Sequence, residues 1–263
     1  MDENTNSLHI FYRLSDKGEI KQKMPSVNNK SCLENFLQNF PSDSVDLIAD
    51  NVTDETFKWL EGYHVKKIHR TALGNVGSFW YCFQLALTLP GNDYVYFVEN
   101  DYIHKENSFS VLHEGLKLAD YVTLYDHPDK YINGINPLVK NGGEKTKVLL
   151  SDSTHWKITN STTMTFASKV SVLCKDEFFF KLFTVGIVKE GFPLFKKLQK
   201  RRVPNDYRIF TLLHKYRKRD LISPIPSYST HGEIEYLSPF SDWEKILTKQ
   251  LSTKQLGVQL INN

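Results

Sequence analysis

The sequence YVYFVENDY at residues 94–102 decides how the rest of this chain is read. An apolar run, Tyr94–Val98, leads directly into Glu99, Asn100 and Asp101. Carboxylates at the end of a buried strand cost free energy unless they are paired, solvated or bound to a cation. A hard divalent cation that bridges two phosphates would use such a cluster. The alternative is that Asn100 or Asp101 only begins a turn, and the residues alone favour neither interpretation.

Strands and helices alternate on both sides of this stretch. Short apolar runs predict further buried strands at Leu8–Leu14, Val45–Ala49, Lys66–His69 and Tyr121–Leu124. Between the strands we expect helices at Leu33–Phe40, at Asp54–Leu60 after Thr53, at Ser78–Leu89, and at Phe109–Leu118 after Ser108. This order predicts an α/β fold with a mixed, mostly parallel sheet flanked by helices. Ligands of such sheets bind at the carboxyl ends of the strands.

The second half of the chain has fewer regular signals. Residues 127–165 are rich in Asn, Gly, Thr, Ser and His. Helices are predicted at Lys169–Phe180, Pro193–Lys200, Asp206–Arg217 after Asn205, and Asp242–Leu251. Neither a repeat nor a linker is evident, so we expect one domain over residues 1–263.

Composition excludes several classes of protein. The 263 residues are 40% hydrophobic and 24% charged, which excludes wholesale disorder. A net charge of +3 gives no support for nucleic acid as a partner, so we expect none. The three cysteines, Cys32, Cys82 and Cys174, form no zinc or disulfide pattern. With no signal-peptide pattern and no run of ~18 apolar residues, we expect a cytoplasmic protein.

Two other groups of residues follow predicted strands. Asp50 ends one strand, where it could meet a ribose or a base, whereas Asp54 and Glu55 are explained by the dipole of the next helix. The sequence LGNVGSF at residues 73–79 has glycines before a helix, which let phosphate approach backbone N–H groups. A plain glycine turn with Ser78 as N-cap is the favoured alternative there.

The order of these features resembles the GT-A glycosyltransferases. The sequence ADNVTDET at 49–56 is similar to the D-x-S-x-D-x-T segment of family-two enzymes, and residues 99–101 are similar to their DxD or EDD motif. A closer likeness is to small bacterial and viral GT-A proteins, through FVENDYIH at 97–104, DYVTLYDHPDKY at 120–131 and THGE at 230–233. The resemblance covers roughly residues 8–247.

The resemblance implies roles for individual residues. Asp101 and His231 would bind the metal, and imidazole favours Mn²⁺ over Mg²⁺. Asn100 departs from the usual acid, which puts metal dependence in doubt. The general base would be Asp206, with Asp126 as its rival. Residues assigned to donor binding are Arg13, Asp50, Asn75, Gly77, Ser78, Glu99 and Asn100. Residues assigned to acceptor binding are His127, His155 and Trp156, although a core position for Trp156 is an equal alternative.

The implied function is transfer of a sugar, by a hexosyl- or deoxyhexosyltransferase, from a nucleotide-diphosphate sugar to a glycan or lipid-linked acceptor. We expect an inverting, metal-assisted reaction with Mn²⁺ or Mg²⁺. Residues 1–125 would bind the donor, residues 126–247 the acceptor, and residues 248–263 would form a tail. The alternatives are a nucleotidyltransferase, or a non-catalytic nucleotide- or glycan-binding protein with a degenerate metal site.

Basic residues in the segment 196–219 have two interpretations. The sequences KKLQKRR at 196–202 and KYRKR at 215–219 could contact an anionic membrane surface, which would place the protein at the inner membrane face. The solvated faces of helices are the favoured alternative.

Overall fold

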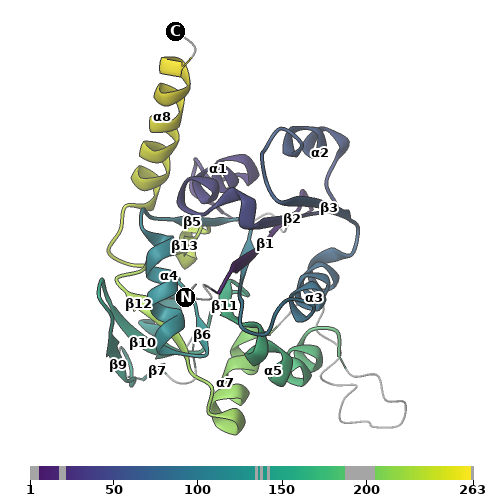
Figure 1. Ribbon diagram of the computed structural model, residues 1–263. Helices are drawn as coiled ribbons and strands as arrows, with labels where there is room; N and C mark the ends of the chain where they lie inside the picture. The colour runs from purple at the N-terminus through teal and green to yellow at the C-terminus, as the bar shows by residue number, and fades with distance from the viewer. Residues whose placement is uncertain are drawn as a thin grey trace, which may run out of the picture.

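A mixed nine-stranded sheet forms the centre of the computed structural model, which describes residues 6–17, 22–133, 136, 139–140, 143–186 and 205–261 (Figure 1). The predicted α/β fold is confirmed. In sheet order the strands are β3 (Lys67–Thr71), β2 (Val45–Asp50), β1 (Leu8–Leu14), β4 (Tyr94–Glu99), β11 (Phe166–Lys169), β6 (Tyr121–Val122), β12 (Leu221–Ile225), β10 (His155–Thr159) and β9 (Val148–Leu150). The order β3-β2-β1-β4 is parallel throughout, so these four strands end at one edge.

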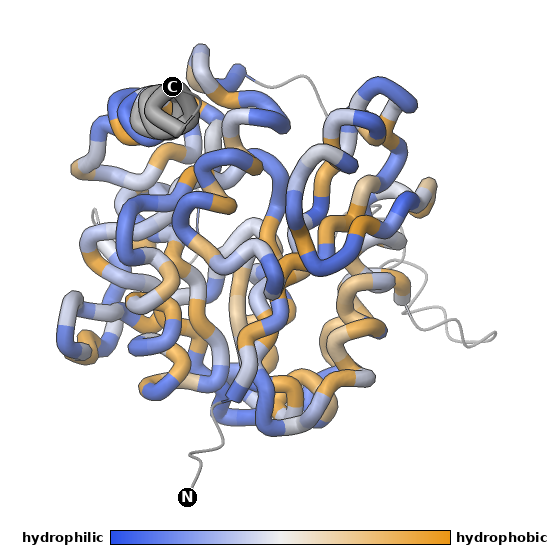
Figure 2. The backbone as a smooth tube through the Cα atoms, turned by 45° about the horizontal axis from the view of Figure 1, so that its top comes forward, coloured by the Kyte–Doolittle hydropathy of each residue, from blue (hydrophilic) through white to orange (hydrophobic). Residues whose placement is uncertain are grey.

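Helices cover both faces of the sheet. The helices are α1 (Asn29–Asn39), α2 (Asp54–Leu60), α3 (Gly74–Leu87), α4 (Ser108–Leu118), α5 (Val170–Phe183), α7 (Asp206–Arg217) and α8 (Trp243–Ile261). Residues of α1, α2 and α4 pack with Ile10 and Tyr12 on one face. Residues of α3, α5 and α7 pack with Phe11 and Phe97 on the other face. Figure 2 shows these hydrophobic stretches in the middle of the molecule, under more hydrophilic loops.

Period-two alternation along β1 explains which side chains reach which face. Because successive side chains of a strand point to opposite faces, Arg13 lies on the same face as Phe11, toward α3. Parallel pairing with β4 places Arg13 beside Glu99 in the register. This alternation therefore brings a cation to the acidic end of β4.

Short elements outside the main sheet complete the fold. A two-stranded sheet joins β5 (Tyr102–His104) to β13 (Ser229–His231), and another joins β7 (Val139–Lys140) to β8 (Gly143–Glu144). Single 3₁₀ turns are η1 (Ser42–Ser44), η2 (Pro128–Lys130) and η3 (Ile234–Tyr236). At the far end of the chain, α8 packs against α1 (Figure 1). Among the described residues, no helix combines the length and apolar character that crossing a bilayer requires.

Most predicted elements are present, with shifted boundaries. Thr53 and Asn205 are N-caps as predicted, because their side chains accept the N–H of Thr56 and of Arg208. The helix predicted from Ser78 begins at Gly74, so Ser78 is not its N-cap. The last helix continues to Ile261, through most of the predicted tail. The helix predicted at Pro193–Lys200 lies outside the described residues.

The buried His104 makes stability depend on pH. Its Nε2 lies 2.9 Å from the Tyr96 hydroxyl, and burial lowers its pKa from 6.5 to about 3. The unfolded chain therefore binds this proton first as pH falls, so the free energy of unfolding decreases between about pH 6.5 and about pH 3.

We predict that His104 lowers the free energy of unfolding by ~2 kcal/mol between pH 7 and pH 5. At pH 5 the unfolded chain is about 1.5 pH units below the pKa of its free histidine, and protonation over that range stabilises the unfolded chain by about that value. Urea denaturation of the wild type and of His104→Gln at both pH values measures it. The variant should lack this part of the pH dependence. Identical pH dependence in the two proteins would contradict the assignment.

Candidate functional site

Arg13 connects β1, β4 and the start of α3. Its Nη1 donates to the Asn75 carbonyl at 2.6 Å and to the Ser78 hydroxyl at 2.9 Å, and its Nη2 pairs with the Glu99 carboxylate. Arg13 is 5% exposed. Burial raises the pKa of Glu99, and the Arg13 guanidinium opposes that shift. Four residues assigned to donor binding therefore lie together, with Arg13 bonded to the protein itself.

Asp50 closes the turn that leads into α3. Its carboxylate accepts the backbone N–H of Leu73 at 2.6 Å and of Gly74 at 2.9 Å, and also the hydroxyl of Thr71 at 2.8 Å and the amide of Asn51. Asp50 is 3% exposed. The sequence placed Asp50 at a ribose or base. In the structure it instead occupies the helix N-terminus where a phosphate was expected, because two backbone donors hold it there.

Steric constraints explain why positions 74 and 77 in the same turn are glycine. Gly74 has a φ of 73°, a left-handed conformation that side chains disfavour. A Cβ at Gly77 would lie 2.8 Å from the Leu73 Cβ, so this position needs glycine for close packing. Both observations explain the Gly-x-x-Gly spacing without a ligand.

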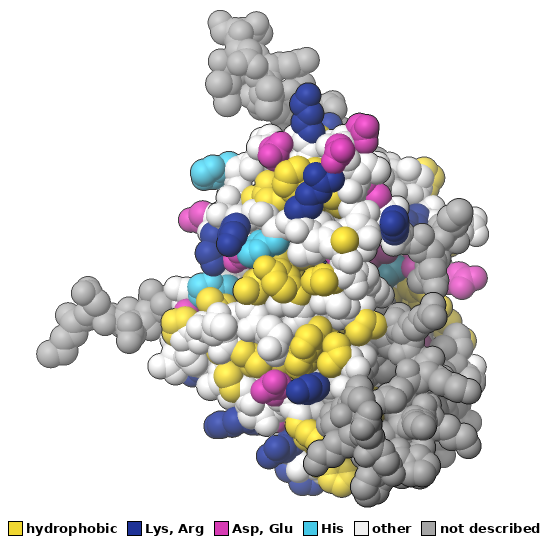
Figure 3. Space-filling model, turned by 90° about the vertical axis from the view of Figure 1, so that its right-hand side faces the viewer, with side chains coloured by type: hydrophobic (Ala, Val, Ile, Leu, Met, Phe, Trp, Pro, Cys, Tyr) yellow, Lys and Arg dark blue, Asp and Glu magenta, His cyan; other side chains and the backbone are white. Residues whose placement is uncertain are grey.

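A hollow of about 600 Å³ lies at the carboxyl ends of β1, β2 and β3. Its lining includes two cations and one carboxylate, and consists of Asp16, Lys17, Asn51, Val52, Thr53, Arg70, Thr71 and Ala72. On the side of the molecule turned toward the viewer in Figure 3, acidic and basic side chains are intermingled in the upper part. The volume is within the ~300–1,000 Å³ of typical ligand pockets.

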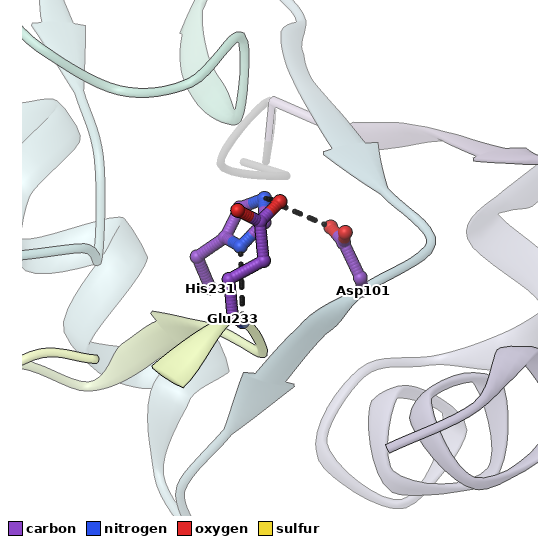
Figure 4. Close-up of side chains that lie close together, drawn as sticks. All are labelled: Asp101, His231 and Glu233. Carbon is purple, nitrogen blue, oxygen red and sulfur yellow. Dashed lines mark hydrogen bonds and ion pairs between the residues drawn. The ribbon is translucent and has the colours of Figure 1, made fainter. Parts of the chain in front are cut away.

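Pairing of β5 with β13 brings the two predicted metal ligands together. His231 pairs with Tyr102 in this register, and the Gly232 N–H donates to the Asp101 carbonyl at 2.7 Å. The Nε2 of His231 lies 3.3 Å from Asp101 Oδ1 and 3.6 Å from Glu233 Oε1 (Figure 4). One ligand atom from each of the three residues lies within 4.8 Å of the others.

Glu233 is the member of this cluster that the sequence reading missed. It belongs to the quoted sequence THGE, and residues two apart on an extended chain point to the same side. That spacing from His231 was the available signal. Two carboxylates and an imidazole suit Mn²⁺ better than Mg²⁺, which prefers oxygen ligands.

The side chain of Asn100 contacts the start of α1. Its side-chain amide donates to the Asn29 side-chain oxygen, and its backbone carbonyl accepts the Tyr12 hydroxyl at 3.4 Å. The amide of Asn100 is therefore used to bind the start of α1.

The two candidate bases differ in their surroundings. Asp126 is 2% exposed, its Oδ1 lies 2.7 Å from Lys157 Nζ, and its Oδ2 accepts the Tyr131 hydroxyl. Both carboxylate oxygens of Asp126 therefore already have partners within the protein. Asp206 begins α7, is half-buried, and its Oδ2 accepts the N–H of Thr162 and of Thr163, both at 2.7 Å.

Of the three residues assigned to acceptor binding, Trp156 lies in the core. Trp156 is fully buried, and its ring packs so closely on Gly115 that a Cβ there would lie 2.7 Å away. The core alternative for Trp156 is therefore correct. His155 is exposed at the start of β10. The His127 ring lies 5.6 Å from the Tyr236 ring, which in turn lies 6.2 Å from the ring of His231.

The basic segment is described only in part, because residues 196–204 lie outside the described residues. In its second half, Arg219 contacts two carboxylates, Asp176 at 3.1 Å and Asp120 at 2.9 Å. Asp176 is fully buried, so Arg219 has a structural role. Arg217 is half exposed.

Removing Arg13 should leave the half-buried Glu99 without its cation. We predict that Arg13→Met lowers the free energy of unfolding by ~3 kcal/mol and that adding Glu99→Gln restores part of it, since an unpaired charge is the main cost. Guanidinium denaturation of both single variants and the double variant tests the coupling. Strict additivity of the two changes is the outcome that would contradict this pairing.

Comparison with known proteins supports the fold. No protein-family model and no curated protein sequence matches the chain. A structure of GalNAc-T7 with UDP, GalNAc and Mn²⁺ is similar at a TM-score of 0.50 and 13% identity, over 95% of this chain and 48% of that one. Residues 1–349 of TarS from S. aureus align at a TM-score of 0.45 and 11% identity, over 88% of this chain and 59% of that one.

A 4-diphosphocytidyl-2C-methyl-D-erythritol synthase from Anaerococcus prevotii also aligns, at a TM-score of 0.45 and 11% identity, over 95% of this chain and 96% of that one. This chain thus spans about half of GalNAc-T7 and about three fifths of the TarS chain. At these identities the likeness concerns the fold alone. The chain has a GT-A-like fold.

Proposed function

We propose that this chain is a glycosyltransferase that moves a sugar from a nucleotide-diphosphate donor to a hydroxyl acceptor. The observation that carries the proposal is the cluster of Asp101, His231 and Glu233 beyond the carboxyl end of β4. The GT-A-like fold supports it. Ligands of such sheets bind at this edge.

The hollow beyond β1, β2 and β3 is our candidate for the nucleoside. It opens at the same edge of the sheet as the metal-ligating cluster. Arg70 and Lys17 offer charged hydrogen-bond donors, and Asn51 offers an amide, so polar groups of a base or ribose would find partners there.

Asp101, His231 and Glu233 are the residues that would hold a divalent cation. The donor set fits, because it combines two carboxylates with one imidazole within 4.8 Å. A cation bound there would neutralise the charge that develops on the departing diphosphate. Glu233 gives the cluster a second carboxylate although Asn100 does not contribute one, so the departure at Asn100 does not argue for a non-catalytic protein.

Asp206 is our candidate for the general base. Two backbone N–H groups hold its Oδ2 and so fix the orientation of the carboxylate, as a positioned base requires. These bonds also fix a turn in which Thr163 and Met164 have left-handed backbone, with φ of 47° and 60°. Such residues are strained by ~1–3 kcal/mol each, so Asp206 orders the turn as well.

The acceptor would bind beside His127 and Tyr236. Tyr236 is 37% exposed, and its ring contacts both His127 and the metal-ligating His231. A partly exposed aromatic ring beside a polar group can bind one face of a sugar while the polar group binds a hydroxyl.

Metal binding tests the site directly. We predict that Asp101→Asn raises the Kd of Mn²⁺ at least about tenfold, because the variant loses a charged ligand. Isothermal titration of the full chain measures this, with and without UDP or GDP. Asp43→Asn, an exposed acid before β2, is the matched control and should bind Mn²⁺ like the wild type.

Asp206→Asn separates chemistry from structure. The amide oxygen of the variant still accepts hydrogen bonds from the N–H groups of Thr162 and Thr163. The amide cannot, however, take up the proton of the substrate hydroxyl that attacks the sugar. In an assay of donor hydrolysis and transfer over a panel of nucleotide sugars, we predict kcat lower by ~10²–10⁴-fold for transfer with an unchanged melting temperature. Full transfer activity in this variant would exclude Asp206 as the base.

A further inference from the structure

A segment from the beginning of the chain is bonded to the loop that carries two of the metal ligands. The Met24 N–H donates to the Gly232 carbonyl at 3.1 Å, and the Ile234 N–H donates to the Gln22 carbonyl at 3.0 Å. Between these bonds, Lys23 pairs with Glu233 in an isolated antiparallel bridge. The backbone of Lys23 is thereby fixed beside the cluster of Asp101, His231 and Glu233.

The side chain of Lys23 reaches Asp101. Its Nζ lies 3.1 Å from Asp101 Oδ2, while the His231 ring approaches the other oxygen, Oδ1, at 3.3 Å. Asp101 is thus shared between an ammonium group and an imidazole. The exposed fractions are 30% for the Lys23 side chain and 15% for the Asp101 side chain, so the pair lies at the open side of the cluster.

Glycine at position 232 allows two other segments of the chain to pack closely against this loop. A Cβ there would lie 2.6 Å from the Val27 Cγ1 and 3.0 Å from the Asp101 carbonyl oxygen. Val27 belongs to the same N-terminal stretch as Lys23. The absence of a side chain at Gly232 therefore lets the Lys23 segment and the Asp101 turn approach the loop from two sides.

We propose that Lys23 is a resident cation of this cluster, which pairs with Asp101 and which a divalent cation must displace in order to bind. The proposal deepens the proposed function, because it concerns the same metal site. A divalent ion on Asp101 would lie close to the Lys23 ammonium, and like charges a few ångströms apart repel. The long, flexible stem of lysine lets the ammonium move away, so competition and not exclusion is expected.

The ion pair of Lys23 with Asp101 also stabilises the cluster of ligands before metal binds. Asp101 and Glu233 both approach His231, and two carboxylates so close together repel each other without a cation. Lys23 supplies one positive charge, so the ligands keep their places in the metal-free protein. The same pairing lowers the affinity for metal, because the cation must displace the Lys23 ammonium from Asp101.

The test compares Mn²⁺ binding by the full-length wild type, Lys23→Met and Lys23→Arg, measured from the electron paramagnetic resonance signal of free Mn²⁺. Lys23→Met removes the charge but keeps most of the stem, and its Kd for Mn²⁺ should fall about threefold to tenfold. Lys23→Arg keeps the charge and should stay within about twofold of the wild type. Lys30→Met, an exposed lysine of α1, controls for long-range charge.

The outcomes separate this inference from the site itself. An unchanged or higher Kd in Lys23→Met, where Asp101→Asn still loses Mn²⁺, overturns the role of Lys23 and leaves the metal site in place. Failure of the wild type to bind Mn²⁺ overturns both. Lys23→Gln is a second neutral variant, and near-ultraviolet circular dichroism of both shows whether the fold is kept. A greater fall of Kd at low salt than at high salt supports competition between charges.

Discussion

Antiparallel pairing of β5 with β13 is the interaction on which the candidate site depends. It joins the turn after β4, which carries Asp101, to the loop that carries His231 and Glu233 from near the other end of the chain. The backbone bond from Gly232 to Asp101 fixes their separation. Without this pairing, Asp101 would lie on a loop unrelated to the one that carries His231 and Glu233, because more than a hundred residues separate them in the sequence.

A second constraint acts behind the cluster. Parallel register between β1 and β4 sets Arg13 against Glu99, and the same guanidinium binds the start of α3. The acidic end of β4 therefore has two differently used carboxylates. Glu99 is neutralised inside the protein and supports the scaffold, whereas Asp101 faces the cluster of ligands. The two acids thus serve structure and chemistry separately, because β4 ends at Glu99 and Asp101 lies in the turn that follows it.

Sequence reasoning identified what local pattern determines. β1, β2 and β4 are long apolar runs, and the caps Thr53 and Asn205 are read from residue type, so each could be predicted. The short strands of the second half were not predicted, because tertiary pairing and not propensity forms them. Burial decided the remaining cases: nothing local distinguishes the core indole of Trp156, or the capping role of Asp50, from an exposed ligand-binding side chain.

The most direct measurement of the central claim is anomalous diffraction at the manganese absorption edge, from crystals of the full chain grown with Mn²⁺ and a nucleoside diphosphate. The account predicts one strong peak at coordination distance, roughly 2.0–2.4 Å, from oxygens of Asp101 and Glu233 and from Nε2 of His231. The diphosphate should lie against the same ion. A manganese peak elsewhere on the molecule, with these three side chains unchanged and unligated, would contradict the account.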